Sequence, residues 1–558
     1  MSWLTAHDGA VVLIQLGVWL ATLIWATPHL RAALADVERR TWIGLAVLSL
    51  LAFSISAFGF PVFARYAALG HEASYLDCFE GRAAPGSEHG WEPYVTYPFF
   101  RWAYWAIGAV VGPERLEVVQ VLNMAARGAT VGALGLAAWA LFGRGSAAIV
   151  AALLLAVHPT HAFWGTSIFN VPLPLFFAAL CVLLATLAWR SGSPRLLAAA
   201  ASTGCLVVAT RVEFGLLAVG LAVLLFAGLG AAWGRHADVK SARFWAPTAA
   251  VLVVLGATVL AGLGALTSQG GYHDVAGYLA TMGRQARFLA FFEPLQRPWA
   301  VVATGIGGVW AIQRVPGGGR LIAGLIGFVV LLYLTLATFN DFAFRHVLLP
   351  GFGAVLLASA AGPALVDALG AEGSRRVLAA VLGACLLGTL ASSGLALRTN
   401  IDRYYMEDEE FRADHPGFAL SELSAADLES GGCYLITDNE RLWERGLAGS
   451  HFNLMEPGEA AQHWQEHDGC ILWLYDLRDH RVDSLVVRSR ALKLHHWFAW
   501  EQLGHARFED GLEAVVFRMT SPPWGLSAPP PGWRWGDEEV GGEEERAEDA
   551  GDPAVESP

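Results

Sequence analysis

Three carboxylates lie within nine residues of one another in the segment GHEASYLDCFEG (70–81): Glu72, Asp77 and Glu80. The segment follows an apolar run, so these acids fall just outside a predicted membrane span. A carboxylate in such a place can act as a general base that takes a proton from a hydroxyl or an amine. The alternative for each acid is an ordinary solvated position in a loop at the membrane surface.

Other ionisable side chains fall at the ends of apolar runs, where a charge is costly unless it faces a cavity or a partner. Arginine suits a phosphate group because its planar guanidinium can bond two oxygens at once. Helix capping and anchoring at the membrane interface are the alternative roles. The candidates for phosphate binding are His158 and His161 in HPTHAFWG, Arg211 in ATRVEFG, Arg284 in loop 267–297, and Arg345 and His346 in FNDFAFRHVLLP. Glu213 and Asp341, in the same segments, are further candidate site residues.

The elements that carry these residues are predicted to be membrane helices. The chain has 558 residues, of which 55% are hydrophobic and 16% charged, a balance typical of a polytopic α-helical membrane protein. We count about twelve runs long enough to cross the hydrocarbon core. They are 10–27, 41–60, 118–142, 146–162, 168–189, 195–211, 214–232, 245–266, 298–313, 321–339, 346–366 and 377–397, and together they predict a membrane domain over residues 1–397.

Arginine and lysine decide the orientation of this domain. Alternate connections are short and basic (28–40, 143–145, 190–195, 233–244, 314–320 and 367–376), which predicts that they are cytoplasmic. Loops 61–117, 267–297 and 340–345, and everything after residue 398, are then external. All the candidate side chains thus lie at the outer face of what would be a bacterial cytoplasmic (inner) membrane. The aromatic segment 97–112 is short for a span and is expected to lie in, or dip into, the interface.

Residues 398–524 are predicted to form a small extracytoplasmic α/β domain. The runs GGCYLITD (431–438) and DGCILWLYD (468–476) are strand-like, with helix-compatible stretches such as GEAAQHWQEH between them, which favours β-α-β units. Residues 500–519 indicate a closing hairpin. Cys433 and Cys470 open the two strand-like runs, so a disulfide could join them in an oxidising compartment. Residues 525–558 form a Pro-rich, acidic tail that is expected to be disordered.

An ordered series of motifs resembles the GT-C membrane glycosyltransferases, in particular the branch of protein O-mannosyltransferases and lipid A aminoarabinose transferases. GHEASYL is similar to the acidic "DEAxYL" stretch of that family, and VTYPFFRWAYW is similar to its "hPPLYY" segment. HPTHAFWGTSIFNVPLPLFF resembles its paired short spans, ATRVEFG its "LTRPEG" segment, and FRHVLLPGFG its "RYLLPLLP" helix. The series covers residues 40–366. It departs from the family pattern at His71 and Asn170, where the family has aspartate.

The resemblance implies an inverting transfer from a polyprenyl-phosphate sugar to a glycan, lipid or protein acceptor. Glu72 or Asp77 would be the base, with His71 and Glu80 beside them. Arg345, assisted by Arg211 or Arg284, would hold the lipid phosphate, with His346, His158 and His161 nearby and Glu213 and Asp341 as further candidates. No cofactor is required: clustered carboxylates could bind a divalent metal, but no ligand spacing demands one. Membrane lipids are expected partners and nucleic acid is not.

The sequence is compatible with three other functions. A transporter or flippase of lipid-linked glycans would line a pathway with its buried charges, but it predicts an internal repeat that the sequence does not show. A catalytically degenerate scaffold of the same fold would account for the departure at His71. A ligase or polymerase of lipid-linked glycans would differ from the transferase mainly in its acceptor.

Overall fold

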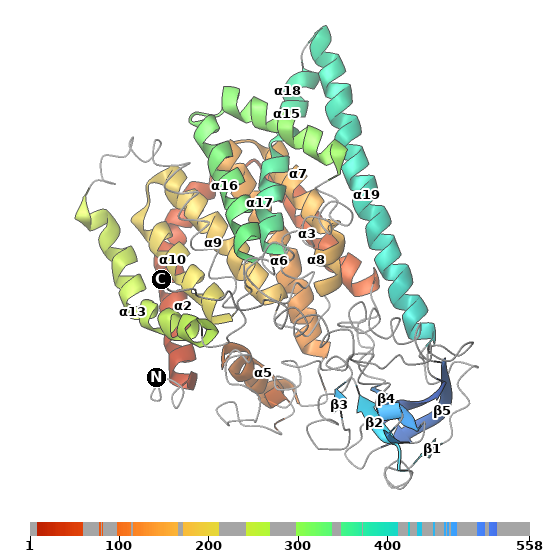
Figure 1. Ribbon diagram of the computed structural model, residues 1–558. Coiled ribbons are helices and arrows are strands. Elements are labelled where there is room, and N and C mark those ends of the chain that lie inside the picture. The colour runs from red at the N-terminus through yellow and green to blue at the C-terminus, as the bar shows by residue number, and fades with distance from the viewer. Residues whose placement is uncertain are drawn as a thin grey trace, which may run out of the picture. The chain divides into compact units, whose positions relative to one another are not determined.

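The computed structural model separates the chain into a helical unit that extends to Arg403 and a second unit from Tyr404 onwards (Figure 1). Each unit is described by itself. The residues that the structure describes are 8–59, 78–79, 81, 98–112, 115, 117–165, 171–210, 241–267, 297–336, 348–370, 372–410, 422–423, 432–437, 450–451, 463–464, 466–467, 470–476, 499–507 and 513–521.

Helices form over the predicted apolar runs wherever the structure describes them; run 214–232 lies outside the described residues. The helices are α2 (Asp8–Leu34), α3 (Arg39–Gly59), α5 (Pro98–Val111), α6 (Glu117–Phe142), α7 (Gly145–Ala156), α8 (Pro159–Trp164), α9 (Pro172–Ser191), α10 (Pro194–Thr210), α13 (Ala242–Thr267), α15 (Pro298–Arg314), α16 (Gly318–Leu336), α17 (Leu348–Ser359), α18 (Ala361–Leu369) and α19 (Ser374–Glu410). The aromatic segment 97–112 is thus helical as α5.

Six stretches of the described chain are helical, long and apolar enough to cross a membrane: Gly9–Leu34, Arg39–Phe58, Glu117–Phe142, Pro172–Ser191, Gly351–Leu369 and Arg375–Arg398. Shorter apolar helices accompany them, among them Gly145–Ala156 and Pro194–Thr210. The prediction of a multi-pass helical membrane protein is therefore confirmed. The count of about twelve spans stays a prediction.

The core of the helical unit lies between α6 and α9, which pack side by side and are bordered by α3, α7 and α10 (Figure 1). Both helices are buried along most of their length. Helices α2, α3 and α19 instead expose large apolar side chains, for example Leu13, Val47 and Leu387. An apolar exterior of this kind is stable in hydrocarbon and not in water, which fits lipid contact.

The second unit contains a mixed sheet with strand order β1-β5-β6-β4-β2-β3 among the described strands. The strands are β1 (Glu422–Leu423), β2 (Tyr434–Thr437), β3 (Ser450–His451), β4 (Ile471–Asp476), β5 (Ala499–Arg507) and β6 (Glu513–Ser521). Strands β2 and β4 pair in parallel, with Tyr434 opposite Ile471, as the predicted β-α-β connection requires. Strands β5 and β6 pair in antiparallel fashion, so the predicted hairpin forms.

Candidate functional site

Two of the predicted site residues, His158 and His161, lie in the described part of the chain, and both are buried. The other predicted site residues lie outside it, so their roles stay predictions. These are His71, Glu72, Asp77, Glu80, Arg211, Glu213, Arg284, Asp341, Arg345 and His346.

A break in the helical chain positions both histidines. Pro159 disfavours a helical conformation at the residue before it, so α7 ends at Ala156 and the chain restarts as α8 with proline in the first turn. His158 is the N-cap residue of α8, and its Nδ1 accepts a hydrogen bond of 3.3 Å from the backbone N–H of His161. His158 therefore has a capping role, the alternative considered from the sequence, and the cap places His161 one turn further on.

A fully buried arginine on α6, Arg127, contacts this break. Its Nη2 donates to the carbonyl oxygen of Ala156, the last residue of α7, at 2.6 Å. Its Nη1 donates to Oγ of Ser56 on α3 at 2.8 Å and also to the carbonyl oxygen of Ala52. Arg127 thus joins α3, α6 and α7 through acceptors that are all uncharged. In a bilayer such bonds matter because the unsatisfied carbonyl of a helix end is costly there.

The fourth bond of Arg127 sets the hydrogen position on His161. Nε of Arg127 lies 3.4 Å from Nδ1 of His161 and can only donate, so Nδ1 carries the lone pair and Nε2 carries the hydrogen. This Nε2 has no hydrogen-bond partner among the residues that the structure describes. The backbone carbonyl of Leu155 interacts with the imidazole of His161. Its geometry is not that of an ordinary hydrogen bond to Nε2. A buried N–H of this kind is a donor that a bound oxygen could satisfy.

Analysis of the sequence missed Arg127 and Ser56. The signal was present, since Arg127 is an ionisable residue well inside the apolar run 118–142, and such residues are functional candidates by default. The predicted candidates lie instead at the ends of the apolar runs. Within the described residues, no carboxylate forms an ion pair with Arg127, and its guanidinium donates hydrogen bonds to uncharged acceptors.

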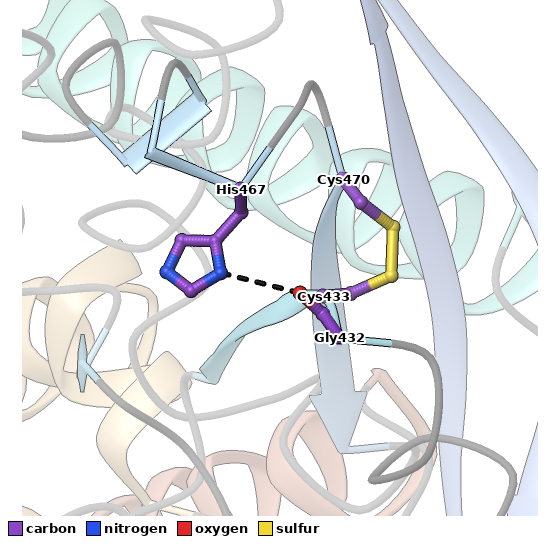
Figure 2. The surroundings of a disulfide bond; sticks show 4 residues. All are labelled: Gly432, Cys433, His467 and Cys470. Carbon is purple, nitrogen blue, oxygen red and sulfur yellow. Dashed lines mark hydrogen bonds between the residues drawn. A yellow bond between two sulfur atoms is a disulfide. The ribbon is translucent and has the colours of Figure 1, made fainter.

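In the second unit a disulfide joins Cys433, just before β2, to Cys470, just before β4 (Figure 2). The Cα atoms are 4.7 Å apart, within the range that a disulfide bridges. The pairing that the cysteine positions made feasible is therefore formed. Disulfides persist in oxidising compartments, so this bond fits the predicted extracytoplasmic side.

Comparison with known proteins gives similarities of structure only. No protein-family model matches the chain, and no curated protein matches it. The chain is similar to the archaeal oligosaccharyltransferase AglB of Archaeoglobus fulgidus, solved with an inhibitory peptide and a dolichol-phosphate, with 12% identity, coverage of 88% of this chain and 75% of that one, and a TM-score of 0.47. It is also similar to ArnT of Cupriavidus metallidurans bound to undecaprenyl phosphate, with 13% identity, coverage of 88% and 100%, and a TM-score of 0.44.

The apo state of the same ArnT gives 11% identity, coverage of 88% and 99%, and a TM-score of 0.42.

Proposed function

We propose that this protein is a membrane glycosyltransferase that moves a sugar from a polyprenyl phosphate to an acceptor at the outer face of the cytoplasmic membrane. The observation that carries the proposal is the ordered series of sequence segments between residues 40 and 366, from GHEASYL to FRHVLLPGFG. No single segment is specific, but their order and spacing together resemble those of the GT-C membrane glycosyltransferases.

The disulfide supports the side of the membrane on which the reaction would take place. The bond between Cys433 and Cys470 favours an oxidising compartment for the C-terminal unit, because disulfides persist there. An even number of predicted spans separates this unit from loop 61–117. The acidic loop is then on the same, external side, where nucleotide sugars are scarce and a lipid-carried donor is the suitable one.

His161 supports a polar contact with the substrate. Its buried Nε2–H is held in place by the bond from Arg127 to Nδ1, and no hydrogen bond of ordinary geometry satisfies it in the described part of the chain, although the carbonyl of Leu155 interacts with the ring. A donor fixed in this way can bond an oxygen of a phosphate or a sugar. Arg127 acts through His161 and is therefore a positioning residue.

The chemistry would be a single displacement. Glu72, or Asp77 in its place, takes the proton from the acceptor hydroxyl or amine as that atom attacks the anomeric carbon of the sugar. The bond between this carbon and the phosphate oxygen breaks, and the polyprenyl phosphate leaves with the electron pair. Arg345, with Arg211 or Arg284, stabilises the negative charge on the departing phosphate. One displacement inverts the anomeric configuration.

The test is transfer of radiolabelled sugar from a panel of polyprenyl-phosphate sugars, in membranes that contain equal amounts of the wild type, Glu72→Gln or Glu372→Gln. Glu372 is exposed on the connection 367–376, predicted to be cytoplasmic, and is a matched control. We expect transfer by the wild type and Glu372→Gln and none by Glu72→Gln. Normal transfer by Glu72→Gln would show that Glu72 is not the base. Asp77→Asn would then be tested in the same assay, because Asp77 is the alternative base.

Absence of transfer from every donor by a folded wild-type protein would contradict the proposal. Translocation of a lipid-linked glycan across the same membranes, without transfer, would then favour the flippase reading.

A further inference from the structure

One helical turn in the second unit brings together three side chains of metal-binding types, His463, Glu466 and His467. Each offers one ligand atom, and these atoms all lie within 4.8 Å of one another. The spacing i, i+3, i+4 explains the grouping, because residues three and four apart share one face of a helical turn. We propose that these residues form a binding site for a divalent metal ion, with Zn²⁺ as the best-fitting ion. The proposal is independent of glycosyl transfer.

The first support is the orientation of His467. Its Nδ1 lies 3.2 Å from the carbonyl oxygen of Gly432, which precedes β2 (Figure 2). A carbonyl only accepts, so Nδ1 carries the hydrogen and Nε2 carries the lone pair. Histidines that bind metals commonly donate their other ring N–H to a carbonyl or a carboxylate, which fixes both the tautomer and the ring. His467 has this arrangement before any ion binds.

The second support is the fixed position of His463. Its ring stacks on that of Tyr434, with centroids 3.8 Å apart and planes 14° from parallel. Its Nδ1 lies 3.1 Å from Oε2 of Glu466, so the imidazole and the carboxylate already face each other. The two side chains are 19% and 48% exposed. An ion can therefore reach them from water, and water can fill its remaining coordination positions.

The third support is the covalent frame around the turn. The backbone N–H of Cys470 donates to the carbonyl oxygen of His467 at 2.9 Å, and that of Tyr434 donates to the carbonyl oxygen of Cys470 at 2.9 Å. Cys470 is also bonded to Cys433. The turn that bears the histidines is thus tied to β2, which begins at Tyr434, and to Gly432 just before it. Preorganisation of this kind lowers the entropy lost when a ligand binds.

The ligand set favours zinc. Two imidazoles and one carboxylate occur in zinc sites that keep a position open for water, whereas Mg²⁺ and Ca²⁺ prefer oxygen ligands throughout. Tetrahedral coordination at ordinary bond lengths places ligand atoms about 3.4 Å apart. From a spread of at most 4.8 Å, the side chains need to close by no more than about 1.4 Å, which side-chain rotation can supply.

The experiment measures zinc bound by the purified full-length protein in detergent, by mass spectrometry of the metal and by competition with a chromophoric chelator. We compare the wild type with His463→Ala/His467→Ala, Glu466→Gln and, as a control histidine in the same sheet, His505→Ala. The wild type and the control should each bind one zinc ion that the double variant lacks. Glu466→Gln should weaken binding by at least the roughly 10- to 100-fold that loss of an outer-shell partner costs, because it removes the one anionic ligand. Cobalt in the wild type should show the visible absorption of a four-coordinate ion.

Correct folding of each variant is checked by formation of the Cys433–Cys470 disulfide. The mass of the protein after alkylation of its free thiols reports the fraction in which the two cysteines are paired. Equal zinc content in the wild type and the double variant would overturn the proposal. A measurement on the wild type alone provides a second test, because an ion that binds the folded unit should slow reduction of the Cys433–Cys470 bond. The same rate of reduction with and without zinc would also count against the site.

Discussion

Gly165 at the end of α8 offers a direct test of how tightly Arg127 is held. Its backbone is right-handed (φ −63°, ψ −21°), so alanine meets no conformational penalty there. A Cβ would, however, overlap Cδ of Arg127 and lie 2.7 Å from Oγ of Ser56 and 3.2 Å from the carbonyl oxygen of Ala162. Arg127 cannot move aside without losing the four hydrogen bonds of its guanidinium.

We therefore expect Gly165→Ala to lower the free energy of unfolding by about 2–3 kcal/mol, the upper part of the range for overpacking a well-filled core. The assay is a reversible unfolding titration in mixed micelles of detergent and dodecyl sulfate. Gly305→Ala is the control, because Gly305 lies within α15 and a Cβ there meets nothing within 4 Å. That change should be neutral, or stabilising by about 0.5–1 kcal/mol.

A double-mutant cycle identifies the cause. In an Arg127→Ala background Cδ is gone and the Ser56 hydroxyl is released from Arg127, so it can rotate away from the added Cβ. Gly165→Ala should then cost about 1 kcal/mol, the lower end of the range for overpacking. Wild-type stability of Gly165→Ala, or an equal cost in both backgrounds, would refute the reasoning.

Three further predictions concern the second unit. Replacing both Cys433 and Cys470 by alanine removes closure of a 37-residue loop and should lower the free energy of unfolding of this unit by about 4 kcal/mol; dithiothreitol should destabilise the wild type equally and leave the variant unchanged in a urea titration. Gly432 has a left-handed backbone (φ +66°) with nothing within 4 Å of an added Cβ, so Gly432→Ala should cost about 1–2 kcal/mol from backbone strain alone and Gly432→Asn less; equal melting temperatures for the two variants would contradict this. Ser450→Cys should react with a membrane-impermeant maleimide in intact cells and Glu372→Cys should not, and the reverse pattern would overturn the topology.

Much of the helical fold could be predicted because membrane spans depend on the length and apolarity of a run. The ends of helices within a run were harder to predict. Run 146–162 was expected to be one span, yet α7 ends at Ala156 ahead of Pro159. Run 346–366 divides at Ala360, and Pro363 explains the division, because its ring excludes a helical bond to Ser359. Proline alone does not decide the matter, since Pro247 lies inside the continuous helix α13.

The polar groupings could be predicted only where their members are close in the sequence. The i, i+3, i+4 order of His463, Glu466 and His467 is visible in HWQEH. The contact of His467 with the carbonyl of Gly432 is not, because 35 residues separate the two partners. Arg127 and His161 come from different helices in the same way, and only their packing shows that one sets the tautomer of the other.

The shortness of α7 has a consequence for how the protein enters the membrane. Its 12 residues span about 18 Å, well below the roughly 30 Å of hydrocarbon, so α7 by itself is too short to cross, and its last carbonyl takes its donor from another helix. Arg127 is that donor, and it is synthesised before α7. Its other backbone and hydroxyl acceptors, Ala52 and Ser56, are on α3 and are synthesised earlier still. During synthesis α3 can therefore shelter the arginine until α7 arrives, and the three helices would insert as one group.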